Sequence, residues 1–223
     1  MAERASVVAL AESYVPSGKE VQAKKIIALL VDSCVKSIGA SFRWSWLTTR
    51  KDDYSFVPAT LVYNQPDDCD TIIRLGKLES GVITEKFDPL DESYVTDNYE
   101  QLTGSSGRFY IPLEKDAAGV KQFRLFPAVT ATITARMVYR RIPSATDIRH
   151  IKDEMMLVYF ILASLPNEML GGSGEIDVAG KFYSLHQKQW KAAVNMDESS
   201  RELDMVFEPP PRAQIIDQYL GGL

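Results

Sequence analysis

The two histidines are the first residues to test for catalytic or metal-binding chemistry. His150 and His186 are far apart, and neither belongs to an H-E-x-x-H pair, in which two imidazoles one helical turn apart bind zinc. The chain also lacks a G-x-S-x-G segment that could present a nucleophilic serine. We expect structural or surface roles for both histidines. The sequence therefore predicts a protein that is not an enzyme and has no catalytic residue, cofactor or bound metal.

The segment "GEIDVAGKF", which starts at Gly174, partly matches a phosphate-binding loop. In that loop four residues separate the first glycine from the Gly-Lys pair, and a magnesium-binding hydroxyl residue follows. Here five residues separate Gly174 from Gly180, and Phe182 follows Lys181. The Gly-Lys pair also falls within a helical pattern, so we expect no nucleotide site in this segment.

Acidic residues cluster at Asp67, Asp68 and Asp70. Carboxylates are calcium ligands, but a calcium loop also needs a glycine at its centre, and this segment has none there. The proline and the acidic residues of "QPDDCD" instead predict a polar turn between two strands.

Two tryptophans, Trp44 and Trp46, stand two residues apart and would share one face of a strand. Aromatic rings on one face could form a platform for stacking sugars or bases, with Arg43 beside them. The alternative is an aromatic lid over the core of a β-region. We take Arg43, Trp44 and Trp46 as a candidate interface of that β-region.

Helical segments are expected at both ends of the region that would carry these residues. The first helix is predicted over about residues 17–38, with Ser17 and Glu20 as a capping box and Gly39 as its stop. A second helix is expected from about Thr146 to Pro166, and a third from about residue 176 to 194. Apolar residues recur at helical spacing in each: Val21, Ile27, Leu30, Cys34 and Ile38; Ile148, Ile151, Met155, Val158, Leu162 and Leu165; Ile176, Ala179, Tyr183, His186, Trp190 and Val194.

Strands are expected between residues 41 and 143, where aromatic and β-branched residues alternate with proline-containing turns. The clearest is "VTATITARMVYR", whose apolar residues from Val129 to Tyr139 alternate with threonines and arginines. In "RFYIPL", Phe109, Ile111 and Leu113 should point the same way. The pattern leaves both a barrel and a sandwich open.

The expected fold class is α+β, a discontinuous helical bundle with an inserted antiparallel β-domain. Residues 1–40 would contribute the N-terminal helix, 41–143 the β-domain, 144–196 the helix pair that completes the helical core, and 197–223 an extended C-terminal arm. The arm contains three consecutive prolines, which favour extended structure. Its apolar residues should dock on a partner or fold back over their own subunit; as a candidate docking arm they are Met205, Val206, Phe207, Pro209, Pro210, Pro211, Ile215, Ile216, Tyr219 and Leu220.

Composition excludes several classes of protein. The net charge is −5 with a pI near 5.2, whereas a sequence-reading DNA-binding protein usually carries a basic surface. Two cysteines, Cys34 and Cys69, are too few for a disulfide scaffold, and we expect a reducing cytoplasm. The N-terminal segment does not read as a signal peptide. The apolar run Met155–Leu165 is shorter than the roughly 20 residues that span a bilayer.

The order of these segments resembles the head–tail adaptor (connector) proteins of short-tailed, podovirus-type bacteriophages. The resemblance rests on "FRWSWLTTR" after an amphipathic helix, "SFVPATLVYNQPDDCDTIIRL", "FRLFPAVTATITARMVYRRIP", "IKDEMMLVYFILASLPNE" and "AGKFYSLHQKQWKAAV". It covers about residues 17–196.

This resemblance implies a structural virion protein at the head–tail junction. Such proteins form a homo-oligomeric ring, commonly a dodecamer, that joins the portal protein to the tail nozzle protein. Genomic DNA would pass through the ring without sequence-specific contacts, and the C-terminal arm would dock on the portal. The alternatives left open are another component of the neck or tail tube, and a glycan-binding β-domain protein.

Overall fold

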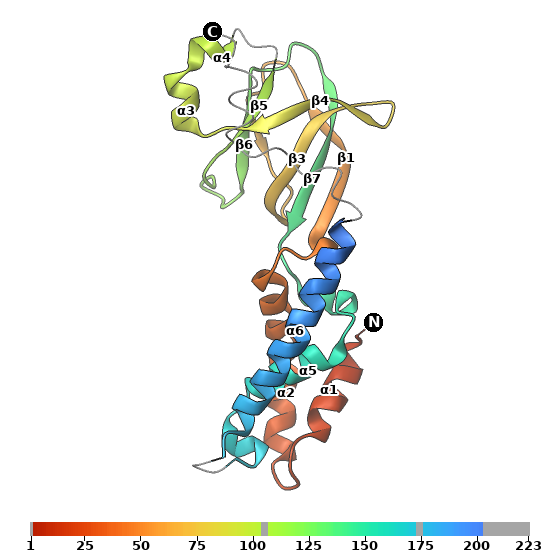
Figure 1. Cartoon of the computed structure of the whole chain (residues 1–223). Coiled ribbons are helices and arrows are strands. Elements are labelled where there is room, and N and C mark those ends of the chain that lie inside the picture. Colours follow the sequence, from red (N-terminus) through yellow and green to blue (C-terminus); the bar gives the residue numbers. More distant parts are fainter. Residues whose placement is uncertain (1, 104–106, 173–175, 203–223) are drawn as a thin grey trace. The chain divides into compact units, whose positions relative to one another are not determined.

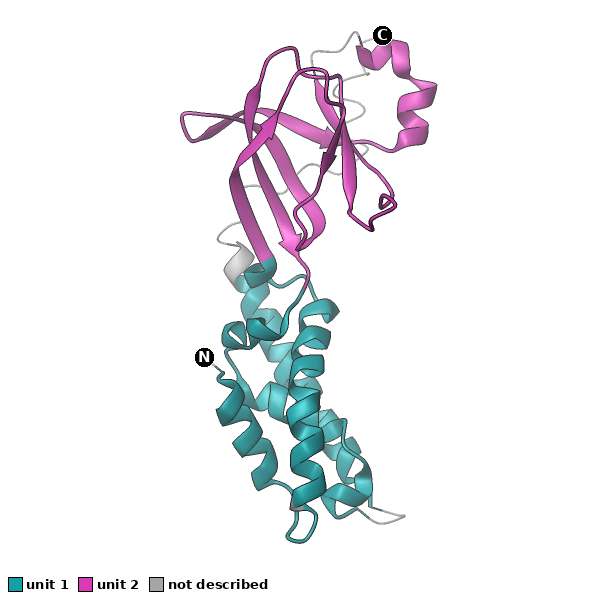
Figure 2. Cartoon of the chain, turned by 180° about the vertical axis from the view of Figure 1, so that it is seen from behind, with its two compact units in different colours: residues 1–47, 143–206 teal, residues 48–142, 207–223 magenta. Residues whose placement is uncertain are grey.

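The computed structural model describes residues 2–103, 107–172 and 176–202 of the chain (Figure 1). The chain is α+β, as expected, and forms two compact units (Figure 2). Unit 1 is helical and contains the described residues up to Leu47 and from Pro143 onward. Unit 2 is Thr48–Ile142 and contains the sheet. The candidate arm residues from Met205 to Leu220 lie outside the described residues.

Unit 1 is organised around one short apolar helix, α5. The sequence of α5, EMMLVYFILA, is apolar all the way round, and α1, α2 and α6 each pack against it. Leu157, Val158 and Ile161 are fully buried, and each such side chain contributes about 1.5–3 kcal/mol of burial free energy. The helical segments of the unit are α1 (Arg4–Ser13), α2 (Glu20–Ser41), η1 (Ser45–Leu47), η2 (Ala145–His150), α5 (Glu154–Ala163), η3 (Asn167–Leu170) and α6 (Val178–Glu202).

The first predicted helix is present, but its ends differ from the prediction. It begins at Glu20, no side chain caps its N-terminus, and the capping box predicted at Ser17 is therefore wrong. Gly39 lies inside α2 and packs against Pro143, so it does not stop the helix. Helical spacing predicts Val21 on the buried face, but its side chain is 73% exposed. The helix α1 was not predicted.

The other two helices also depart from their predicted limits. The single helix expected from Thr146 to Pro166 is two segments, η2 and α5, separated by Ile151 and its neighbours. Asp147 forms a capping box with Ser144 at the start of η2, and Asp153 accepts a hydrogen bond from the Met155 amide at the start of α5. These two caps explain the break. Helix α6 continues past Met196 to Glu202, into the expected arm.

Unit 2 is one seven-stranded sheet in the order β1-β7-β3-β4-β5-β6-β2, neither two packed sheets nor a purely antiparallel domain. The pair β4 and β5 is parallel, because the short helices α3 (Glu92–Asp97) and α4 (Tyr99–Thr103) lie in the connection between them. The strands are β1 (Thr48–Phe56), β2 (Val62–Asn64), β3 (Cys69–Glu79), β4 (Val82–Pro89), β5 (Arg108–Pro112), β6 (Gln122–Phe126) and β7 (Ile133–Arg141).

The alternation predicted for β7 is confirmed over its second half. Ala135, Met137 and Tyr139 are buried. Arg136 lies on the opposite face, where its guanidinium donates two hydrogen bonds to the Asp52 carboxylate, from Nε at 2.6 Å and from Nη2 at 3.0 Å. The strand begins at Ile133, four residues after the predicted start at Val129. Ion pairs therefore cover the polar face of the sheet, and apolar side chains fill the other.

The sheet curls so that its two edge strands, β1 and β2, approach each other. Tyr54 of β1 donates a hydrogen bond to the Asn64 carbonyl of β2, and Phe56 packs edge-on against Tyr63 at 4.7 Å between ring centroids. The Tyr63 hydroxyl accepts from the Val57 amide at 3.1 Å and lies 2.9 Å from the Thr60 carbonyl. The curled sheet thus encloses an aromatic core, and hydrogen bonds of the Tyr54 and Tyr63 hydroxyls stabilise the curl.

A second, smaller core lies beneath α3 and α4. Phe109 and Ile111 of β5 are buried in it, with Leu113 packed against them. The prediction that these three side chains point the same way is confirmed. The intervening Tyr110 enters the main core of the sheet.

Candidate functional site

The two tryptophans belong to unit 1 and not to the sheet, so their predicted place on a strand of the β-region is wrong. The alternation of "FRWSWL" suggested a strand, but α2 runs on to Ser41 and leaves only a short connection, which closes as the 3-10 turn η1. The Trp44 indole N–H donates to the Ile38 carbonyl at 2.7 Å. That carbonyl lies in the last turn of α2, where acceptors have no partner within the helix, so Trp44 terminates the helix.

Three rings form a stack beside this turn. Trp44 lies on Trp46 with 6.1 Å between ring centroids and 22° between planes, and Trp46 lies on His150 at 5.6 Å and 8°. Phe42 meets Trp44 edge-on at 4.9 Å. Trp44 is only 4% exposed, whereas Arg43 is exposed. Trp46 is stacked on both sides, so the structure brings Trp44 and Trp46 together as core and not as an open platform.

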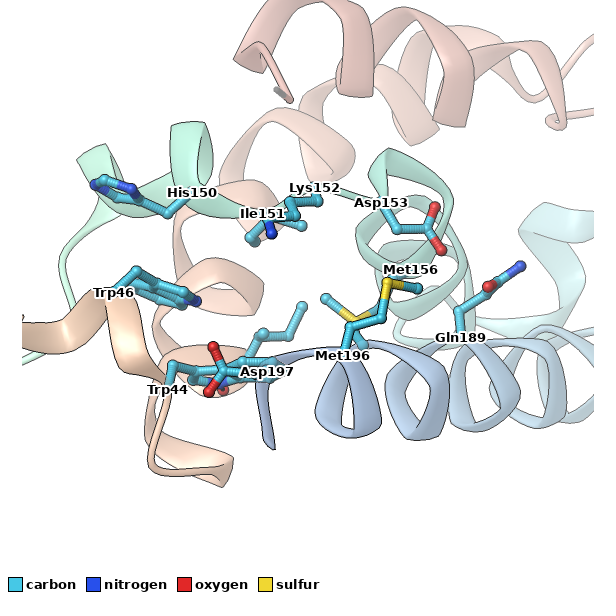
Figure 3. Close-up of a pocket in the computed structure, with 12 residues that line it drawn as sticks. Trp44, Trp46, His150, Ile151, Lys152, Asp153, Met156, Gln189, Met196 and Asp197 are labelled. Carbon is cyan, nitrogen blue, oxygen red and sulfur yellow. Dashed lines mark hydrogen bonds between the residues drawn. The ribbon is translucent and has the colours of Figure 1, made fainter. Parts of the chain in front are cut away.

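A pocket adjoins the stack within unit 1 (Figure 3). Its volume is about 70 Å³, and Trp46 and His150 lie at one end with Gln189 of α6 at the other. The end of α2, the η2–α5 connection and α6 form its walls. The lining residues are Ile38, Trp44, Trp46, His150, Ile151, Lys152, Asp153, Met156, Gln189, Ala193, Met196 and Asp197.

The polar groups of the pocket are largely committed to holding the structure. Asp153 caps α5 by accepting from the Met155 amide at 3.0 Å. Asp197 accepts from the Ser45 amide at 2.9 Å and from the Ser45 hydroxyl at 2.5 Å, which joins the end of α6 to η1. With Lys152, the lining residues carry two carboxylates and one ammonium group, so a mostly apolar lining has a slight excess of negative charge.

The second histidine has a structural environment. His186 is buried, stacks on Phe160 at 4.5 Å between centroids, and has Nδ1 2.9 Å from the Met156 carbonyl. Burial lowers the pKa of His186 below its ordinary value of 6.5, because desolvation disfavours the imidazolium. The neutral ring therefore joins α6 to α5.

The two cysteines are both buried. Burial raises the pKa of Cys34 to about 11 and that of Cys69 to about 12. At neutral pH both remain thiols, which are poor nucleophiles.

The acidic turn before β3 uses its carboxylates in local contacts. Asp68 accepts from the Tyr139 hydroxyl at 2.9 Å. Asp70 pairs with Arg140 at 3.0 Å and with Lys121 at 3.6 Å. Among the described residues no group of three or more His, Cys, Asp or Glu side chains could hold a metal ion.

The segment that resembles a phosphate-binding loop lies at the start of α6. Gly180 and Lys181 are inside the helix, as the helical pattern predicted, and Asp177 accepts from the Gly180 amide at 2.8 Å. Gly174 lies outside the described residues. A carboxylate therefore already occupies the helix N-terminus where a phosphate would bind.

Comparison of the sequence with models of protein families and with curated proteins finds no match. Within the described part of the chain, none of the helices has the length and hydropathy needed to cross a bilayer.

Sequence reasoning missed the residues that complete the pocket. His150, Met156 and Met196 come from three separate segments, and only the tertiary packing brings them to Trp46. The apolar periodicity placed the neighbouring Met155 on the inner face of its helix. The sequence pattern also did not predict that Leu29 and Met196 are exposed.

Proposed function

We propose that this chain is a head–tail adaptor of a short-tailed bacteriophage, a structural protein that forms a ring between portal and tail nozzle. In this proposal the helical segments from both ends of the chain complete one bundle, and the bundles of neighbouring copies pack side by side. The observation that carries the proposal is that two different helices of unit 1 keep large apolar side chains in solvent. Leu29 of α2 is 76% exposed and Met196 of α6 is 59% exposed.

Exposed apolar residues on two distinct surfaces support head-to-tail association better than a symmetric dimer. When one surface of a copy binds a different surface of the next, the assembly either closes into a ring or extends as a filament. Isolated exposed apolar residues are common on monomers. Here, however, Val21 lies two turns before Leu29 on α2, and Leu185 precedes Met196 on α6.

The acidic composition supports a passive channel for DNA. Each copy carries a net charge of −5, so the summed field of a ring would repel phosphates and would not retain them. Arginines on the polar face of the sheet are neutralised by neighbours, as in the contact of Arg136 with Asp52 and that of Arg108 with Glu85 at 2.9 Å. These pairs neutralise arginines that could otherwise contact phosphates from this face of the sheet.

The test is electron cryomicroscopy of the full chain mixed with the portal protein of the same virus. The proposal predicts a closed ring of this chain on the portal. A matched variant that ends after Glu202 keeps α6 whole and removes the candidate arm, and we expect it to bind the portal more weakly. A bare portal at saturating concentrations of the full chain would refute the adaptor proposal.

The alternatives make different predictions. Another neck or tail-tube component would form rings or tubes without the portal. A glycan-binding protein would need open aromatic faces, but Trp44 is buried and Trp46 is stacked on both sides. Ring assembly that depends on the portal distinguishes the adaptor from both.

A further inference from the structure

We infer that Leu29 of α2 on one copy inserts into the pocket beside Trp46, His150 and Met196 on a second copy of the chain. The inference rests on the proposed ring, since it names the two surfaces that would meet at each contact between neighbours. It predicts a heterologous contact that buries the most exposed large apolar residue of α2.

The projecting surface of α2 is apolar and basic. Val21, Lys25 and Leu29 follow one another at intervals of four residues, so they share one side of the helix, and all three are exposed. Lys36 continues this side. The acidic residue nearest to Leu29, Asp32, is engaged by Arg4 of α1 at 3.3 Å, which leaves the lysines to set the charge.

The receiving surface is apolar and acidic. The buried Ile38, Ile151 and Met156 line the pocket, and so does the exposed Met196. Among the charged residues that line the pocket, Asp153 and Asp197 outnumber Lys152. Basic residues around Leu29 and acidic residues around the pocket are therefore complementary, which favours a second copy over a partner of unknown charge.

The size of the pocket points to a side chain and not to a small molecule. Pockets that bind drug-sized ligands enclose about 300–1,000 Å³. The pocket in unit 1 has about 70 Å³, well below that range. A space of this size suits one inserted side chain, and the thioether of Met196 can adapt its shape to the inserted group.

The test is disulfide cross-linking of the full chain, with Leu29→Cys and Met196→Cys introduced together. The native cysteines are both buried, so they should contribute little background. Under mild oxidation, with portal protein present, we expect a ladder of covalent multimers from the double variant. A mixture of the two single variants should stop at a heterodimer, because each copy then carries only one half of the contact.

The matched control pairs Leu29→Cys with Lys191→Cys, an exposed position on another side of α6. It should give no ladder. Circular dichroism of each variant checks that the fold is retained. A second measurement uses Leu29→Asp, which should raise the concentration needed for assembly at least tenfold. Its matched control is Ser37→Asp, at an exposed position of α2 outside the row of Val21, Lys25 and Leu29.

The outcomes separate this inference from the proposed function. Rings on the portal without the Leu29–Met196 ladder, or with an equal ladder from the Lys191 control, would overturn the inference and keep the adaptor. A ladder in solution with a bare portal would keep the contact and overturn the adaptor. Efficient dimers from Leu29→Cys alone would show a symmetric contact and also overturn the inference, and the absence of both ring and ladder would overturn both.

Discussion

Replacing Gly39 by alanine sets two opposing effects against each other inside α2. Alanine is favoured over glycine in a helix by about 1 kcal/mol, so the change would stabilise an open site. At Gly39, however, an added Cβ would lie 2.6 Å from Cβ and 2.8 Å from Cγ of Pro143, and 3.4 Å from the edge of the Trp46 ring. Carbon atoms in contact prefer about 3.5–4.0 Å, so the proline ring must move by about 1 Å.

The overlap should outweigh the helix propensity. Overpacking of a tight site costs about 1–3 kcal/mol, and a proline ring cannot rotate away as a flexible side chain can. After subtraction of the propensity difference, we expect Gly39→Ala to lower the free energy of unfolding of unit 1 by about 0–2 kcal/mol. All three tryptophans of the chain, Trp44, Trp46 and Trp190, belong to unit 1, so urea unfolding followed by tryptophan fluorescence reports on this unit.

The control is Ser37→Ala, an exposed position on the same helix, which should be neutral or stabilising by about 0.5 kcal/mol. Combining Gly39→Ala with Pro143→Gly removes the clashing atoms, so the double variant should be more stable than the sum of the single effects predicts. A Gly39→Ala variant that is more stable than the wild type would refute the reasoning, because it would show that Pro143 yields freely.

Three further predictions address other contacts. Tyr63→Phe should destabilise unit 2 by about 1–3 kcal/mol, since it leaves the Val57 amide without its acceptor. The free energy of unfolding should fall as the pH drops below about 6.5, because the unfolded chain binds a proton at His186 before the folded chain does, and His186→Phe should reduce this dependence. Leu157→Ala should lower the free energy of unfolding by about 2–5 kcal/mol, because its side chain is fully buried. Leu185→Ala at the surface should change the free energy of unfolding by less than about 0.5 kcal/mol.

Each of these has a direct control. Tyr99→Phe alters an exposed tyrosine of unit 2 and should leave its unfolding unchanged. For the histidine, urea titrations at pH 5.5 and 7.5 that differ equally in the wild type and in His186→Phe would contradict the assignment. For the core residue, similar losses from Leu157→Ala and Leu185→Ala would show that α5 is not the centre of unit 1.

The sequence predicts elements whose periodicity is local. Alternation in β7 placed Ala135, Met137 and Tyr139 on the buried face because one side of that strand meets the core. Periodicity does not predict the limits of an element that is packed against others on all sides. Helix α5 is apolar on every side, so its pattern merged with that of η2 and concealed the break that Asp153 makes.

Short elements were harder to predict, since tertiary contacts decide them. The segment around Trp44 and Trp46 has the alternation of a strand, but the preceding helix ends so late that the chain must turn at once. Helices α3 and α4 are too short to show a period and are held by the core beneath them. The pocket could not be predicted, because its walls join residues from the two ends of the chain.

The pairing of β1 with β7 has a consequence for the order of folding. Thr48 lies opposite Arg140, so the first and last strands of unit 2 bring together the points where the chain leaves and re-enters unit 1. Closing an unstructured loop of about one hundred residues would cost about 4 kcal/mol of chain entropy. If the sheet forms early, this entropy cost is met before α2 packs against α5 and α6. The pairing of β1 with β7 would then bring the two parts of unit 1 together and promote their packing.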